Sequence, residues 1–225
     1  MHIEPGLVDD TKIVLSYATG GGALLYTAKL CWETLLQRGP LSFLVRSAIT
    51  TALVFSFFEL LPHQPVGVSE VHLILGSTLF LVFGVGPAAL GLSLGLLLQG
   101  FFFEPQDLPQ YGMNVTTLLV PLFALTGLAK QIIAPQTPYV ELSYRQAFAL
   151  SATYQSGIVA WVAFWALYGQ GFSMANLTAI ATFGGAYLLV VTVEPLVDLA
   201  VLAAAKALHG LKGSAVVETR LFHSV

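Results

Sequence analysis

Long apolar runs dominate this chain and restrict its fold more than any other feature. The longest covers residues 71–103, and the others are also continuous rather than alternating with polar residues. About 20 apolar residues cross a bilayer as a helix, whereas the strands of a membrane barrel alternate. Only 9% of the 225 residues are charged and 56% are hydrophobic, against roughly a quarter charged in soluble domains. The sequence therefore predicts an all-α, polytopic integral membrane protein in a prokaryotic cell (inner) membrane.

Helix breakers and polar clusters divide these runs into about seven predicted transmembrane helices, within a range of six to eight. They are expected at residues 13–36, 43–61, 71–83, the remainder of the 71–103 run, 113–133, 146–168 and 175–208. Gly84-Val85-Gly86-Pro87 predicts a tight turn inside the 71–103 run, and Pro195 predicts a kink or break in the last helix. One domain, 1–225, is expected, with an outer N-terminal metal-binding loop (1–12), a helical bundle (13–208) and a cytoplasmic tail (209–225).

The distribution of charge predicts an N-terminus outside and a C-terminus inside. With this orientation the inner segments hold most basic residues: Arg38, Arg46, Lys130, Arg145, Lys206, Lys212 and Arg220. The outer loops hold the acidic residues Glu4, Asp9, Asp10, Glu70, Glu104 and Asp107, with Lys12 as their one basic residue. This is the positive-inside pattern of multi-pass membrane proteins.

Met1-His2 is the first candidate metal site. The α-amine of Met1, the amide nitrogen of His2 and its Nδ1 are contiguous donors that can close two fused chelate rings in one plane. A second imidazole can fill the fourth corner, and His72 begins a predicted helix on the same outer side. Nitrogen donors in a square plane suit Ni(II) and Cu(II), and imidazole also suits Co(II) and Zn(II). The start of the chain lacks a basic n-region, so we expect no cleaved signal peptide and a free amine.

Each of these histidines has an ordinary alternative, because a lone histidine is more often a solvated tail or an interfacial residue than a ligand. His63, beside Pro62, is a candidate additional ligand and otherwise a loop residue. Gln99 and Asn114 are candidates for supporting a ligand imidazole or the N-terminal segment, and otherwise cap or join helices. Glu194 is a candidate functional carboxylate inside the membrane, or else lies at the inner interface.

Several kinds of chemistry are excluded by the sequence. It contains no G-x-x-x-x-G-K-[ST], no H-E-x-x-H and no G-x-S-x-G. The single cysteine, Cys31, rules out an internal disulfide and any cysteine-based zinc or iron–sulfur site. No catalytic residues are predicted, the chain is not expected to be an enzyme, and nothing indicates nucleic-acid binding.

The pattern resembles the CbiM/NikM family, the substrate-binding membrane (S) components of cobalt and nickel transporters of the energy-coupling-factor type. The resemblance lies in Met1-His2-Ile3 followed by a Pro/Gly/acidic turn, in His72-Leu73 with Gly76, and in Gln99-Gly100 followed by Gly112-Met113-Asn114. Three details differ from the family pattern. The turn reads Glu4-Pro5-Gly6 rather than Pro-acidic-Gly, and Ile74-Leu75 replace the threonine or small residue often found after the His-Leu pair. The Gly-Pro turn after His72 is also displaced.

The resemblance implies an importer subunit that chelates Co(II) or Ni(II) as substrate through Met1, His2 and His72. It also implies partners: ATPase subunits of an ABC transporter, a membrane coupling (T) subunit and a small auxiliary membrane subunit, all at the lipid bilayer. Two other functions remain open at this point: a non-transporting scaffold or metallocentre-assembly protein, and a passive metal channel. The sequence does not choose between cobalt and nickel.

Overall fold

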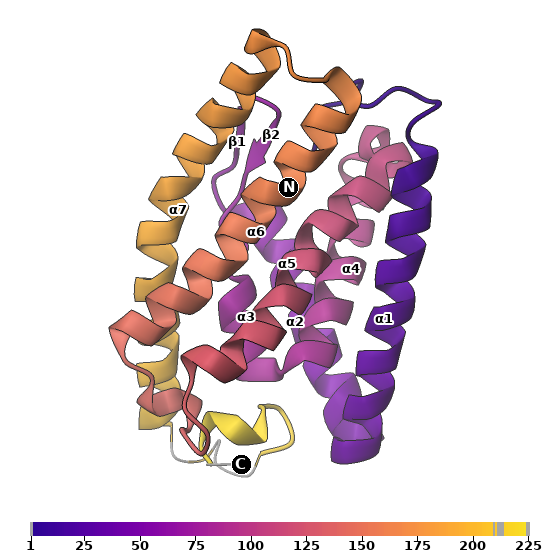
Figure 1. Cartoon of the computed structure of the whole chain (residues 1–225). Coiled ribbons are helices and arrows are strands. Elements are labelled where there is room, and N and C mark those ends of the chain that lie inside the picture. Colours follow the sequence, from indigo (N-terminus) through magenta and orange to yellow (C-terminus); the bar gives the residue numbers. More distant parts are fainter. Residues whose placement is uncertain (1, 209, 211–213, 224–225) are drawn as a thin grey trace.

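The computed structural model describes residues 2–208, 210 and 214–223 and folds them into a bundle of seven α-helices (Figure 1). The helices are α1 (Val14–Arg38), α2 (Pro40–Leu60), α3 (Gly76–Phe83), α4 (Val85–Phe102), α5 (Tyr111–Ile132), α6 (Tyr144–Gln170) and α7 (Met174–Ala207). The predicted all-α polytopic fold is confirmed. Among the described residues, five helices are long and apolar enough to cross a membrane, namely α2, α4, α5, α6 and α7.

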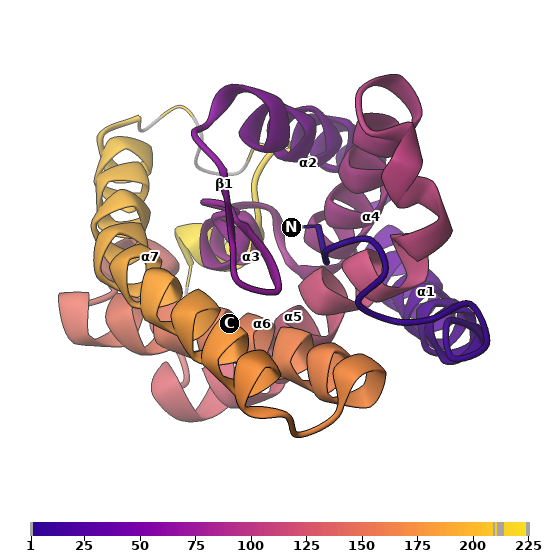
Figure 2. The same cartoon turned by 90° about the horizontal axis from the view of Figure 1, so that it is seen from above.

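The short helix α3 lies in the middle of the bundle. Seen from above, it is surrounded by α2, α4, α5, α6 and α7, whereas α1 lies at the outside against α4 and α5 (Figure 2). Gly84, at φ +82°, ends α3 and starts α4, which confirms the tight turn expected inside the 71–103 run. Seven of the eight residues of α3 are buried, so this helix forms the centre of the core and does not face lipid.

The predicted ends of two helices need correction. The third helix begins at Gly76 rather than at residue 71, because the preceding segment forms a β-hairpin of β1 (Gln64–Val66) and β2 (Ser69–Val71). The last helix does not break at Pro195, since α7 is a single helix from Met174 to Ala207. A proline is tolerated there because neighbouring groups in a membrane bundle can satisfy the freed carbonyls.

Small residues allow α4 to approach α2 closely. A Cβ atom added to Gly91 would lie 2.5 Å from Thr50, and one added to Gly95 would lie 2.6 Å from Val54. The Thr50 hydroxyl uses this closeness to donate to the carbonyl oxygen of Pro87 over 2.7 Å. The small-residue face of α4 therefore serves internal packing, as small-xxx-small faces commonly do in membranes.

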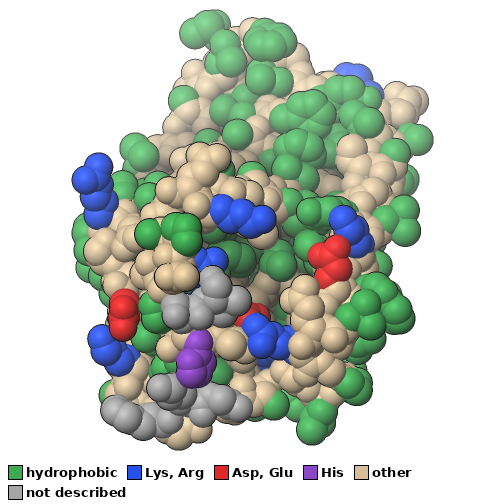
Figure 3. Space-filling view, turned by 60° about the horizontal axis from the view of Figure 1, so that its bottom comes forward, with side chains coloured by type: hydrophobic (Ala, Val, Ile, Leu, Met, Phe, Trp, Pro, Cys, Tyr) green, Lys and Arg blue, Asp and Glu red, His purple; other side chains and the backbone are tan. Residues whose placement is uncertain are grey.

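The end of the bundle opposite the hairpin is covered by the C-terminal segment, 214–223, which contains the 3₁₀ helix η4 (Thr219–Leu221) (Figure 1). The backbone N–H of Glu218 donates to the carbonyl of Val82 over 2.7 Å. Its carboxylate pairs with Arg38 and with the fully buried Arg46 at 3.0 and 2.9 Å. Basic side chains gather at this end of the molecule (Figure 3). Which side of the membrane it faces stays a prediction from the charge distribution.

Candidate metal centre

The N-terminal segment is held between the β-hairpin and α5. The His2 carbonyl accepts hydrogen bonds from Ser69 Oγ at 2.8 Å and from the N–H of Glu70 at 3.0 Å. The N–H of Ile3 donates to Asn114 Oδ1 over 3.0 Å. These bonds insert His2 into the bundle, where only 5% of the residue is exposed. Met1, the predicted source of the amine ligand, lies outside the described residues.

Both ring nitrogens of His2 face protein groups. Nε2 lies 2.9 Å from Gln99 Oε1, at the end of α4. Nδ1 contacts the carboxylate of Asp107 in the 3₁₀ helix η1 (Pro105–Gln110). Gln99 and Asn114 thus lie where supports of the N-terminal segment were expected, one on the ring and one on the backbone. Asp107 was expected to be only an outer-loop residue, and its contact with His2 depends on the folding of η1 over α4.

His72 follows β2 directly and is 1% exposed. Its Nε2 lies 2.9 Å from Glu70 Oε2. Its Nδ1 is buried and has no hydrogen-bond partner among the described residues. Burial is the main cause that holds the pKa of His72 far below its usual value, and the neighbouring His2 and His63 act in the same direction. The ring is therefore neutral and offers a lone pair to a metal ion.

His2, Glu70 and His72 converge on one point. One ligand atom from each lies within 4.8 Å of the others, and the two imidazole rings are 5.6 Å apart between centroids. Two imidazoles and a carboxylate form a donor set for divalent transition metals such as Co(II), Ni(II) and Zn(II). Sequence reasoning did not select Glu70. The spacing of Glu70 and His72 places both on one face of an extended segment, which is the signal that could have indicated it.

Aromatic rings enclose this cluster on one side. Phe58 lies 5.0 Å from the His72 ring and 5.9 Å from the His2 ring. His63 stacks on His72 with centroids 4.9 Å apart and an interplanar angle of 10°. The stacked His63 covers the face of His72 and is not among the three residues whose ligand atoms converge. Its role as an additional ligand stays a prediction.

Glu194 lies apart from the histidines, in the interior of the bundle. It is 0% exposed, and its depth in the membrane stays a prediction. Asp198, one turn further along α7, is equally buried, and Ser77 Oγ contacts both carboxylates at 2.9 and 2.8 Å. The sequence indicated Glu194 but not its partners, because α3 and α7 are far apart in the chain.

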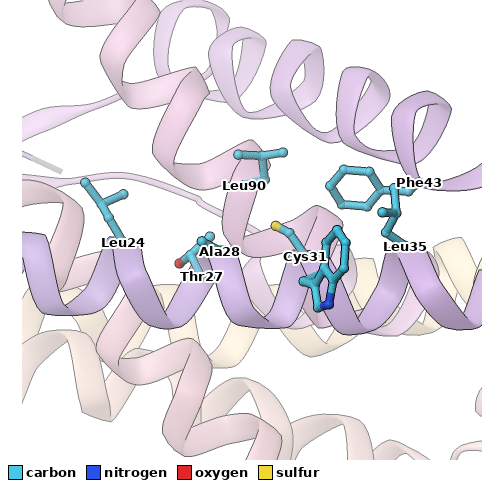
Figure 4. Close-up of a pocket in the computed structure, with 8 residues that line it drawn as sticks. Leu24, Thr27, Ala28, Cys31, Leu35, Phe43 and Leu90 are labelled. Atoms are coloured by element: carbon cyan, nitrogen blue, oxygen red, sulfur yellow. The ribbon is translucent and has the colours of Figure 1, made fainter. Parts of the chain in front are cut away.

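A groove of about 350 Å³ between α1 and its neighbours does not include the histidines (Figure 4). It is formed by α1, α2 and α4 and is lined by Leu24, Thr27, Ala28, Cys31, Trp32, Leu35, Phe43 and Leu90. The Cys31 thiol is half-buried there and donates to the carbonyl of Gly86 over 3.6 Å. Its surroundings are mostly apolar side chains, so Cys31 packs as a small apolar helix residue.

Two solved structures resemble this fold. One is a crystal structure of a truncated transition metal transporter, with a TM-score of 0.69 and 18% identity over 93% of this chain and 100% of that one. The other is a crystal structure of a transition metal transporter, with a TM-score of 0.68 and 17% identity over 92% of this chain and 93% of that one. No curated protein sequence matches. At these identities the likeness shows a shared fold.

The family comparison covers nearly the whole chain. Residues 2–209 match the model described as "Cobalt uptake substrate-specific transmembrane region". The match includes the N-terminal segment, the hairpin with His72 and all seven helices described above. This multi-pass membrane protein therefore belongs to the CbiM family of cobalt-uptake transmembrane components.

Proposed function

We propose that the chain is the substrate-binding membrane subunit of an ATP-driven importer of Co(II) or Ni(II), of the energy-coupling-factor type. The observation that carries this proposal is the convergence of His2, Glu70 and His72 within 4.8 Å at a protected position. The family match and the transition metal transporters with the same fold support a metal ion as the substrate.

The proposed ligands are the α-amine of Met1, the amide nitrogen and Nδ1 of His2, and His72. Asp107 contacts Nδ1, the ring nitrogen that this chelate uses. Chelation therefore requires the Asp107 carboxylate to withdraw or to join the ligands. Glu70, which pairs with His72, is a further candidate ligand. Four nitrogens in a plane favour Ni(II), whereas an added carboxylate suits the higher coordination numbers that Co(II) accepts.

Binding of this kind depends on pH. The His2 amide must lose its proton to become a ligand, and the α-amine must be neutral. Protons therefore compete with the metal, and affinity falls in acid.

The partners we propose are two ATPase subunits and a membrane coupling subunit, with a small auxiliary membrane subunit. The support for separate ATPases is the lack of a phosphate-binding loop in the sequence of a chain that belongs to an uptake family. The single domain 1–225 would then capture metal at its outer end and release it inward when the partners hydrolyse ATP.

The experiment compares bound metal and metal uptake for the wild type, His2→Ala, His72→Ala and a variant with one residue added before Met1. The added residue moves the amine out of the chelate and spares both imidazoles. We expect all three variants to lose stoichiometric binding and uptake, whereas the control Lys29→Gln, on the exposed face of α1, behaves like the wild type.

Three other results would contradict parts of the proposal. Unchanged affinity in the extended variant would exclude the amine as a ligand. Absence of metal uptake by the wild type, with no effect of removing both histidines, would favour a scaffold. Metal flux through the purified chain without ATP would favour a channel.

A further inference from the structure

The carboxylates of Glu194 and Asp198 form a buried acidic pair that the histidine site does not use. They lie four residues apart on α7, on one helix face, and both residues are 0% exposed. A carboxylate at this depth is costly in a membrane protein unless it is paired. The described residues show no ion pair to either one, so the pair lacks a protein cation within that part of the chain.

Ser77 contacts both carboxylates of this pair, but it has only one proton to donate. Ser77 Oγ lies 2.9 Å from Glu194 Oε1 and 2.8 Å from Asp198 Oδ2. A hydroxyl has one proton and can donate to only one of them. The other contact joins two acceptors, and it is favourable only when a proton or a metal cation lies between or beside them. One proton leaves a net negative charge on the two carboxylates, whereas one divalent cation neutralises both.

Further oxygen donors surround the pair. Thr78 Oγ1 contacts Asp198, and Gln155 Nε2 donates to Glu194, which places the Gln155 amide against the carboxylates. Gln155 Oε1 is buried and has no hydrogen-bond partner among the described residues. Ser151, one turn earlier on the same face of α6, is also fully buried, and its Oγ is unpartnered within the described part of the chain. Carboxylate, hydroxyl and amide oxygens are ligands for a divalent cation.

This cluster lies near the histidines, further into the helical bundle. Ser77 follows His72 by five residues, so at most about 18 Å of chain separates them. The buried Tyr187 hydrogen-bonds to the backbone of His72 and interacts electrostatically with Glu194. Tyr187 precedes Glu194 by seven residues, close to two helical turns, and therefore lies on the same face of α7. Helices α3 and α7, which carry these polar groups, lie next to each other in the bundle (Figure 2).

We propose that Glu194, Asp198, Ser77, Thr78 and Gln155 form a second, inner metal site that receives the divalent ion after it leaves the histidines. This inference rests on the proposed function for the origin of the ion. Oxygen ligands bind Co(II) and Ni(II) less tightly than nitrogen ligands, so an ion passing inward meets a weaker site from which it can be released.

The test uses Co(II) with the purified full chain and with cells that express it together with its partner subunits. His2→Ala/His72→Ala removes the outer site, and we expect it to retain one weakly bound Co(II). Adding Glu194→Gln/Asp198→Asn should abolish that ion. In the otherwise wild-type chain, Glu194→Gln/Asp198→Asn should keep outer binding, which also shows that it folds, and lower Co(II) uptake at least tenfold. Glu33→Gln, a carboxylate exposed on α1, is the matched control.

The possible failures are distinguishable. If the wild type neither binds nor accumulates Co(II) or, in a parallel assay, Ni(II), the proposed function fails. If the wild type accumulates Co(II) and Glu194→Gln/Asp198→Asn does so at the same rate, only the inner site is refuted. If uptake falls but His2→Ala/His72→Ala binds no Co(II) at millimolar concentration, the pair carries a proton instead, and the inner metal site is again refuted.

Discussion

Replacing Gln99 by leucine tests whether the protein positions the His2 ring for metal binding. Gln99 Oε1 lies 2.9 Å from His2 Nε2, and both residues are buried, with 2% and 5% of their surface exposed. When Nε2 donates to this oxygen, the hydrogen bond selects the ring form in which Nδ1 carries no proton and can bind metal once Asp107 withdraws or joins the ligands. Leucine has nearly the same volume as glutamine but cannot accept the hydrogen bond, so Nε2 loses its partner.

Two arguments give the size of the effect. Leaving a buried donor without a partner costs about 1–3 kcal/mol. Loss of a hydrogen bond that orients a metal-bound histidine lowers metal affinity by roughly 10- to 100-fold, which corresponds to about 1.4–2.8 kcal/mol. The two ranges agree. We therefore expect Gln99→Leu to weaken Co(II) or Ni(II) binding by one to two orders of magnitude without changing the stoichiometry.

The assay is competition with a chromophoric chelator on the purified protein. Gln110→Leu is the matched control, because this glutamine ends η1, is 7% exposed and its Oε1 has no partner among the described residues. Gln99→Glu retains an acceptor oxygen and should recover most of the affinity. Equal metal affinities for Gln99→Leu and Gln110→Leu would refute the positioning role.

Three more predictions concern the metal site and the stability of the fold around it. Glu70→Gln should lower metal affinity by roughly tenfold or more, because it removes a negative charge from the three converging groups. Titration calorimetry measures this affinity, and an unchanged value excludes Glu70 as a ligand. Gly67→Ala should lower the unfolding temperature more than Gly6→Ala. Both glycines have φ above +60°, a backbone conformation that costs alanine about 1–2 kcal/mol. Only at Gly67 would the added Cβ also collide with a carbonyl oxygen of α7, that of Ala179. Arg46→Met should lower the free energy of unfolding by about 1.5–3 kcal/mol, because Glu218 loses one of its two charged partners. Adding Glu218→Gln should recover part of that loss.

The arrangement of the helices could largely be predicted from the sequence. Continuous apolar runs separated by proline, glycine and polar clusters indicate spans, because a bilayer imposes both a length and internally satisfied backbone bonds. The turn at Gly84 was also evident, since a run of 33 residues exceeds one span. Pro195 was misleading as a break, because the neighbours that stabilise α7 there are distant in sequence.

The β-hairpin could not be predicted in the same way. β1 contains Pro65, which argues against a strand, and both strands are only three residues long. Its stability depends on contacts from elsewhere, including the bridge between Ile3 and Ser69. Without this hairpin, the His2 carbonyl would lose its hydrogen bonds from Ser69 and Glu70.

The sequence by itself determined that this chain is a multi-pass helical membrane protein, and it indicated His2, His72, Gln99 and Asn114, because each stands out chemically in an apolar chain. Only the tertiary structure decided which groups meet. It placed Glu70 with the two histidines, Asp107 against His2, and Asp198 with Glu194. These pairings depend on the hairpin, η1 and α3 packing against helices that are distant in the chain. No local pattern encodes such a contact, because its free energy comes from burying the whole interface at once.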